Sequence, residues 1–298
     1  MEFLYIGIIL LIAVVFTCLF VYFRKDGAEK GDSKDMAKKN ERDEFVGRKI
    51  LCIANSYGDD SVKYVREIAE NLGYKGVVIA NLYIGGCSLE RHYNNMLSGE
   101  KKYEYRKNDN GEWITRYETA LDEGIMDEEW DMIIMQQQSA RTASWSTYQP
   151  YLNELKAHVK QLRPNALLGF NMTWAYPACS QSPEFVQFDN SQEKMYSRIT
   201  SVISTRIDTD CDFYCVIPTG TAVQNARALV GEILHRDNIH LNEEGRFLAS
   251  LCWVKEIFGA DINELSYAPD FVSRELADAF IEAVNCAYEY PFYVTAKK

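Results

Sequence analysis

Short apolar segments alternate with amphipathic segments along the chain from Lys49 onward. Five apolar segments have few polar interruptions, which is typical of parallel strands covered on both faces. These are residues 49–55, 76–83, 131–136, 166–173 and 212–218. Segments with helical periodicity lie at about 60–72, 89–97, 147–162, 190–209, 242–258 and 273–289. This alternation predicts a three-layer α/β/α sandwich around a five-stranded parallel sheet with right-handed crossovers.

One segment interrupts this order. Residues 103–117 have the pattern of two short strands joined at an Asp-Asn-Gly turn, residues 109–111, which predicts a β-hairpin. The hairpin is expected to be an insertion between the second and third parallel strands.

The N-terminus carries a long apolar run. From Phe3 to Phe23 there are 21 consecutive residues without a charge, enough for a helix to span a bilayer. A cleavable signal peptide is disfavoured because Met1 and Glu2 place no basic residue before the run. Lipidation at Cys18 is disfavoured because the run continues beyond it. Residues 1–23 are therefore expected to be an uncleaved, single-pass transmembrane anchor.

Residues 24–48 are rich in Lys, Asp, Glu and Gly, with almost nothing to bury, which predicts a flexible charged linker. Residues 49–298 then form one domain. The basic residues of the linker lie next to the anchor, and the positive-inside rule would place the domain on the cytoplasmic side.

The charge of the chain narrows the choice of partners. The formal net charge is -11. Nucleic acid is excluded as a partner, since phosphate binding needs clustered Lys and Arg. Of the eight cysteines, four fall inside predicted strands or helices and no pair has Cys-x-x-Cys spacing, which favours reduced thiols over a disulfide framework or a metal site.

Candidate catalytic residues follow the predicted strands, at the sheet edge where ligands of open α/β sheets bind. Ser56 comes directly after the first strand, where its hydroxyl and its N–H would lie at a helix start, although Ser is also a common N-cap there. Gly85 and Gly86 follow the second strand and allow close backbone approach, or form a tight turn. The third strand runs into residues 136–139, Gln-Gln-Gln-Ser, whose amides can donate hydrogen bonds without adding charge or can cap the strand end.

Near the end of the chain, Asp237 and His240 are three residues apart in a predicted loop. A carboxylate at this spacing can hold an imidazole in one tautomer, and the imidazole can then act as a base toward a serine. The other three histidines have no equally placed carboxylate or lie on an amphipathic helix. Taken alone, an Asp-x-x-His pair is also common as a helix N-terminal turn.

The order of these blocks resembles the SGNH (GDSL-like) hydrolase superfamily over about residues 49–258. That family has a flavodoxin-like fold, in agreement with the predicted strands. The resemblance implies that Ser56 is the nucleophile, that Asp237 and His240 complete a triad, and that the N–H groups of Ser56 and Gly86 form an oxyanion hole. It implies no metal or organic cofactor. Most enzymes of this kind act outside the cell, which conflicts with the positive-inside rule and leaves the membrane side open.

Two blocks depart from the family pattern. Ala54-Asn55-Ser56 stands where Gly-Asp-Ser or Gly-Asn-Ser is usual, and the Gly-x-Asn-Asp block is replaced by the Gln-Gln-Gln-Ser segment. That segment is similar to the Gln-Gly-Glu-Ser stretch of the carbohydrate acetylesterases within the superfamily. By this comparison Gln136 is expected to donate its side-chain N–H to the oxyanion, with Gln138 lining the substrate pocket. Trp174, after the fourth strand, is a candidate platform for a sugar ring, with packing as the alternative.

The expected function is hydrolysis of an acyl ester, such as an acetyl ester on a carbohydrate. The substrate is then a small-molecule or carbohydrate ester, and the membrane is contacted only through the anchor. The alternative is a membrane-tethered glycan-binding module that has the same fold and no turnover.

Overall fold

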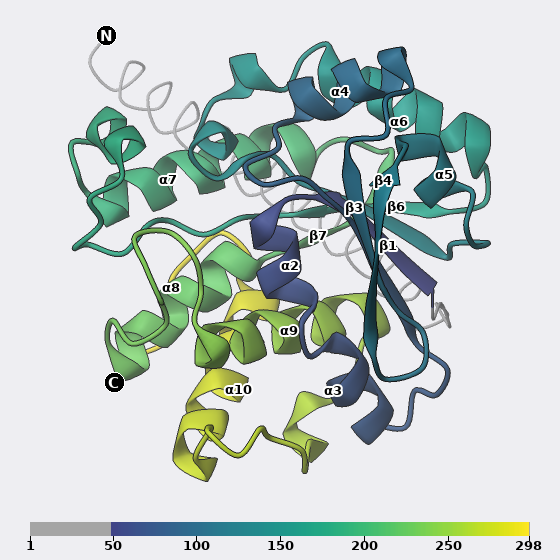
Figure 1. Cartoon of the computed structure of the whole chain (residues 1–298). Coiled ribbons are helices and arrows are strands. Elements are labelled where there is room, and N and C mark those ends of the chain that lie inside the picture. Colours follow the sequence, from purple (N-terminus) through teal and green to yellow (C-terminus); the bar gives the residue numbers. More distant parts are fainter. Residues whose placement is uncertain (1–48, 298) are drawn as a thin grey trace, which may run out of the picture. The chain divides into compact units, whose positions relative to one another are not determined.

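The computed structural model describes residues 49–297 (Figure 1). The predicted anchor and linker, residues 1–48, lie outside the described residues. Within the described part, no helix has the length and apolar character needed to cross a membrane.

A seven-stranded sheet forms the centre of the described domain. Five of its strands are parallel and follow the order β2-β1-β5-β6-β7. This is the 2-1-3-4-5 order of flavodoxin-like folds. All five predicted parallel strands are confirmed, at β1 (Lys49–Ala54), β2 (Val78–Tyr83), β5 (Met132–Met135), β6 (Leu167–Asn171) and β7 (Phe213–Ile217).

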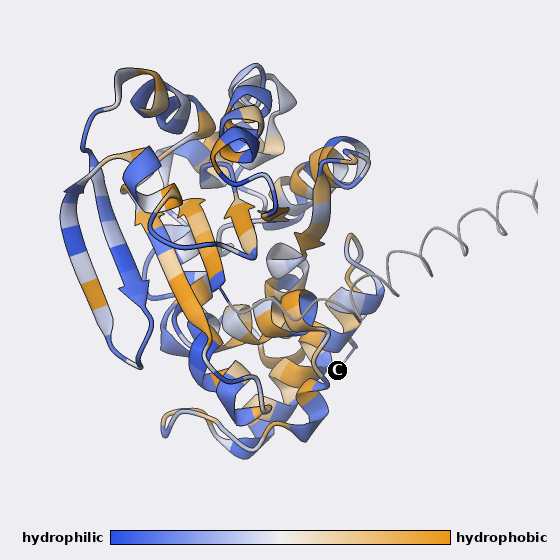
Figure 2. Cartoon of the chain, turned by 90° about the vertical axis from the view of Figure 1, so that its right-hand side faces the viewer, coloured by the Kyte–Doolittle hydropathy of each residue, from blue (hydrophilic) through white to orange (hydrophobic). Residues whose placement is uncertain are grey.

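The predicted hairpin also forms between the second and third parallel strands, and it extends the sheet. Its strands are β3 (Tyr103–Asn108) and β4 (Trp113–Thr119), and β3 pairs antiparallel with β2. The prediction of a five-stranded sheet is therefore wrong in the strand number. The physical reason is that β2 would otherwise have an open edge, and the hairpin satisfies that edge with a backbone ladder. Figure 2 shows the difference in character: the parallel strands are mainly hydrophobic and the hairpin is mainly hydrophilic.

Helices cover both faces of the sheet (Figure 1). One layer contains α2 (Ser56–Val62), α3 (Val65–Asn71), α8 (Thr219–Val230), α9 (Glu243–Phe258) and α10 (Arg274–Glu289). The other contains α4 (Leu89–Ser98), α5 (Leu121–Ile125), α6 (Tyr151–Leu162) and α7 (Gln192–Val202). Short helices occur at η1 (Ser139–Ala143), η2 (Trp145–Thr147), η3 (Pro183–Phe188), η4 (Ile203–Ile207) and η5 (Ile262–Glu264). The three-layer α/β/α architecture is confirmed.

The predicted helix at 60–72 is two helices, α2 and α3, because a tertiary contact stabilises a break between them. The hydroxyl of Ser250 on α9 donates to the carbonyl of Ser61 at 2.8 Å and accepts from the N–H of Tyr64 at 3.0 Å. These bonds satisfy backbone groups that leave the helical ladder at the break. α9 packs against α2, α3, α8, α10 and β7, which explains why it is buried on nearly all sides. Neither α8 nor α5 was expected from the hydrophobic pattern of the sequence.

Gly220, in the first turn of α8, provides a test of this packing. A Cβ placed at Gly220 would lie 2.3 Å from the carbonyl oxygen of Thr173, a backbone atom that cannot rotate away. We expect Gly220→Ala to lower the free energy of unfolding by about 1–3 kcal/mol, the usual cost of overpacking. Gly85→Ala is the matched control, because its nearest contact is the Tyr83 hydroxyl at 3.5 Å. Equal thermal unfolding midpoints for the two variants would contradict this account.

Candidate active site

Ser56 lies where the sheet meets α2. Asn55 follows β1 and is the N-cap of α2, since its side-chain oxygen accepts the N–H of Tyr57 at 3.0 Å. Ser56 is the first residue of that helix and is partly exposed. The N–H of a first helical residue has no partner within the helix. The strand end and the cap together hold Ser56 at the carboxyl edge of the sheet.

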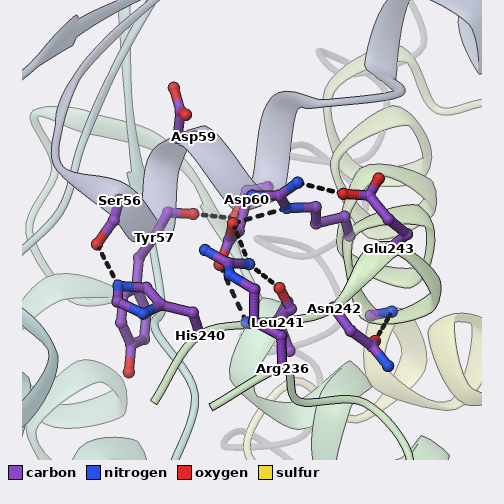
Figure 3. Close-up of polar contacts among 12 residues, drawn as sticks. Ser56, Tyr57, Asp59, Asp60, Arg236, His240, Leu241, Asn242 and Glu243 are labelled. Atoms are coloured by element: carbon purple, nitrogen blue, oxygen red, sulfur yellow. Dashed lines mark hydrogen bonds and ion pairs between the residues drawn. The ribbon is translucent and has the colours of Figure 1, made fainter. Parts of the chain in front are cut away.

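The structure brings together the three residues that the sequence named as a triad. The Nε2 atom of His240 is 2.8 Å from the Oγ atom of Ser56 (Figure 3). The Nδ1 atom of the same ring is 2.8 Å from the Oδ2 atom of Asp237. One imidazole therefore contacts a hydroxyl with one nitrogen and a carboxylate with the other, which is the arrangement of a serine-hydrolase triad.

Asp237 is held in its charged form by its own loop. Partial burial raises the pKa of Asp237, but the backbone N–H groups of His240 and Ile239 and the His240 ring lower it to about 2. The two N–H groups donate to Oδ1 at 2.7 and 2.8 Å, while Oδ2 faces the ring. A carboxylate fixed in this way favours the tautomer with the proton on Nδ1, which leaves Nε2 free to accept a proton from Ser56.

A buried carboxylate, Asp60, connects the helix of Ser56 to the loop of His240. Its Oδ1 atom accepts from Arg236 at 3.0 Å and from Arg246 at 2.8 Å, and its Oδ2 atom accepts the N–H of Leu241 at 3.0 Å (Figure 3). Burial raises the pKa of Asp60, and the two guanidinium groups oppose that shift. No role was expected for Asp60 from the sequence. Its position one helical turn after Ser56 could have marked it as a candidate site residue, because a carboxylate there points either to the same side as the nucleophile or into the core.

Trp174 makes a second connection between the same two elements. Its ring stacks on Tyr57 of α2, with centroids 4.0 Å apart, and its Nε1 atom donates to the carbonyl of Ile239 at 3.0 Å. The side chain is 0% exposed. Of the two alternatives for Trp174, packing is therefore the one the structure shows, and a sugar platform is ruled out because the ring is fully covered and the indole N–H is bonded inside the protein. Its contacts position the loop that carries His240.

Gln136 also differs from its predicted use. Its amide nitrogen donates to Oδ1 of Asn55 at 2.7 Å, and its oxygen accepts from Nδ2 of Asn171 at 3.0 Å. The side chain is buried and spans two neighbouring strand ends. The structure thus places this amide against Asn55, the residue before Ser56, rather than in position to bind an oxyanion. Gln136 is a positioning residue.

These amides belong to a row of side-chain hydrogen bonds across the carboxyl ends of all five parallel strands. After β2, the carbonyl of Cys87 accepts from Nδ2 of Asn55 at 2.9 Å. Asn55, Gln136 and Asn171 follow in sheet order, and the Oδ1 atom of Asn171 accepts from the Thr219 hydroxyl, after β7, at 2.7 Å. We call the connected residues Cys87, Asn55, Gln136, Asn171 and Thr219 the amide row. All are almost fully buried.

The amide row ties the turn that contains Gly86 to the residue before Ser56, because the Cys87 carbonyl accepts from the side chain of Asn55. Gly86 has φ +60, in the left-handed region that favours glycine. Gln137 holds the same turn through its oxygen, which accepts the N–H of Leu89 at 3.0 Å. Gln138 is partly exposed, and its amide lies 3.3 Å from Glu184. The three glutamines thus contact different partners, and Gln138 alone among them reaches the surface.

Residues 49–289 match the family described as a domain of unknown function, DUF4886. The chain belongs to this family. A crystal structure of a DUF4886 protein from Bacteroides uniformis is 32% identical, with a TM-score of 0.79 over 83% of this chain and 96% of that one. Comparison with curated proteins finds no match.

Two other solved structures have lower sequence identity and lower structural similarity to this member of DUF4886. A candidate SGNH hydrolase from Slackia heliotrinireducens is 19% identical, with a TM-score of 0.48 over 70% of this chain and 98% of that one. A catalytic mutant of an acetylxylan esterase from Geobacillus stearothermophilus is 12% identical, with a TM-score of 0.43 over 72% and 96% of the two chains. At these levels of similarity neither structure carries an argument about this chain.

Asp60→Asn tests how the site is held together. The substitution keeps the shape of the side chain but removes the charge that faces two arginines. Because breaking a buried ion pair leaves the partners uncompensated, we expect the free energy of unfolding to fall by about 3–5 kcal/mol. The control is Asp278→Asn, which removes an exposed pair with Arg274 and should cost about 0–1 kcal/mol. Urea unfolding of both variants would show the difference, and similar midpoints would refute the role of Asp60.

Proposed function

We propose that this DUF4886 protein is a serine esterase in which Ser56 is the nucleophile. The observation that carries the proposal is the continuous contact from Ser56 through His240 to Asp237. His240 Nε2 takes the proton of the Ser56 hydroxyl as Oγ attacks the ester carbonyl, and it then gives that proton to the leaving alcohol. Water, activated by the same nitrogen, attacks the acyl-enzyme and releases the acid.

The tetrahedral intermediate needs hydrogen-bond donors for its negative oxygen. We assign this role to the backbone N–H groups of Ser56 and Gly86. Support comes from the helix start at Ser56 and from the bond of the Asn55 side chain to the Cys87 carbonyl, which joins the residue before Ser56 to the residue after Gly86. Because the Gln136 amide nitrogen is bonded to Asn55, the assignment leaves it out of the oxyanion hole.

For the substrate we propose a small acyl group, such as acetyl, on a carbohydrate. The support is the resemblance of the Gln-Gln-Gln-Ser segment to the carbohydrate acetylesterases. The rival proposal is a glycan-binding module with the same fold and no turnover. A fluorophosphonate probe separates the two, because it labels only an activated serine: labelling that disappears in Ser56→Ala supports the esterase, and absence of labelling supports the module.

Substitutions in the triad give a quantitative test. Ser56→Ala and His240→Ala remove a reacting group, so each should lower kcat for 4-nitrophenyl acetate by on the order of 10³-fold or more. Asp237→Asn should cost less, because it disturbs the orientation and tautomer of His240 without removing a reacting group.

A natural control for these variants is His158. Its Nε2 atom is 2.6 Å from Asp122, so it forms a second Asp–His pair, on the surface and away from Ser56. His158→Ala should therefore retain wild-type kcat. The nucleophile assignment would be wrong if Ser56→Ala kept full turnover while the protein remained folded.

We also propose that Phe3 to Phe23 anchor the protein in a membrane and that residues 24–48 act as its linker. A chain that begins at Val46 contains the whole described domain and should be soluble, with the kcat of the full-length protein. Fractionation of cells should place the full-length protein with membranes and the shortened one in the soluble fraction. Loss of folding in the shortened chain, followed by circular dichroism, would contradict this division.

A further inference from the structure

The outward face of α2 extends from the candidate nucleophile into a cavity. Ser56, Asp59 and Lys63, the C-cap, are spaced as i, i+3 and i+7, and each is partly exposed while most of the intervening residues are buried. Asp59 and Lys63 line a cavity of about 240 Å³. With a helical rise of 1.5 Å per residue, the two residues of α2 that line the cavity lie about 5 Å and about 10 Å from Ser56 along the helix axis.

The β3–β4 hairpin forms the opposite wall of this cavity. Arg106 and Thr115 are paired across the two strands, and strand alternation places every second residue on the same face. That face is directed toward α2, as the contact of Arg106 with Asp59 shows. The hairpin residues that line the cavity are Glu104, Arg106, Trp113, Thr115 and Tyr117. We call this space the hairpin cavity.

The charges in the hairpin cavity are balanced and held in place. Arg106 is bonded to Asp59, contacts Glu104 at 2.6 Å and lies over the ring of Tyr83 at 3.7 Å. With the positive charge of Lys63 added, the two basic and two acidic side chains that line the cavity have no net charge. A cavity without net charge favours a neutral ligand, and its fixed carboxylate and guanidinium groups can accept from and donate to hydroxyl groups.

Aromatic rings supply the apolar part of the same wall. The Tyr117 side chain is 67% exposed, although nothing in the fold requires an aromatic ring there. Trp113 lies further along the same strand face and is partly exposed. Rings combined with a few fixed polar groups are typical of ligand pockets, and a sugar ring matches them because it carries C–H groups on its faces and hydroxyls around its rim.

We propose that the hairpin cavity binds neutral glycosyl units of the alcohol part of an ester whose acyl group lies at Ser56. This inference rests on the proposed esterase function and specifies its substrate. The hairpin would then determine which sugar the enzyme accepts, while Ser56, His240 and Asp237 perform the chemistry.

Binding is tested first in full-length Ser56→Ala, which cannot turn over a substrate. The probes are cellotriose, mannotriose and chitotriose, with trigalacturonate as a charged comparison, and binding is measured by titration calorimetry. At least one neutral trisaccharide should bind more tightly than trigalacturonate. Adding Tyr117→Ala should weaken its binding about tenfold, through loss of ring stacking, whereas Tyr117→Phe should preserve it.

Ile114→Ala is the matched control, because Ile114 is on the same strand, is also exposed, at 59%, and faces the other side of the hairpin. It should bind the trisaccharide as the parent does. The inference is overturned if no neutral trisaccharide binds, if trigalacturonate binds best, or if Tyr117→Ala and Ile114→Ala have equal effects.

Kinetics separates this inference from the proposed function. The ratio of kcat/KM for the acetylated form of the bound trisaccharide to kcat/KM for 4-nitrophenyl acetate should fall about tenfold in Tyr117→Ala and stay constant in Ile114→Ala. Hydrolysis of 4-nitrophenyl acetate with a ratio insensitive to Tyr117 refutes the hairpin cavity and leaves the esterase standing. Tyr117-dependent trisaccharide binding without any ester hydrolysis refutes the esterase and retains the cavity as a glycan site.

Discussion

The site depends on the amide row that crosses the carboxyl ends of the parallel strands. A buried amide is costly unless its donors and acceptors find partners. Asn55, Gln136 and Asn171 each contact the next member in sheet order, so each satisfies part of its neighbour's requirement. The Cys87 carbonyl and the Thr219 hydroxyl complete the row at its two ends. Because Asn55 precedes Ser56, the position of the candidate nucleophile is set by bonds that reach across the whole parallel sheet.

The second half of the site comes from the loop of His240, which is 184 residues after Ser56, and two buried side chains attach that loop to the same helix. Asp60 binds the loop through charge, by Arg236 and the N–H of Leu241. Trp174 binds it through stacking on Tyr57 and a hydrogen bond to Ile239. Neither touches Ser56 or His240 through a hydrogen bond, yet together they fix the distance between them. In a site built in this way, a disturbance of packing at Asp60 or Trp174 is expected to change the distance between Ser56 and His240.

The hairpin gives this domain a feature beyond its five parallel strands. By pairing with β2 it covers one edge of the sheet, and it also places a row of polar and aromatic side chains opposite the exposed face of α2. In our two proposals, different parts of the fold therefore perform the ester hydrolysis and bind the sugar. The triad depends on strand ends that are buried and hydrogen-bonded to one another, whereas β4, the outer strand of the hairpin, is hydrophilic and largely exposed, so its outward side chains can vary without disturbing them (Figure 2).

The sequence by itself determined the five parallel strands and named Ser56, Asp237 and His240, which the structure brings into contact. Apolar runs and their order along the chain are local signals, and they are sufficient for strands covered on both faces. The tertiary structure alone decided that the hairpin joins the sheet, that Gln136 bonds to Asn55, and that Trp174 is buried against Tyr57. It also decided the break between α2 and α3. In each case the outcome depends on which distant group satisfies a polar atom or covers a ring, and a pattern of hydrophobic and polar positions does not encode that choice of partner.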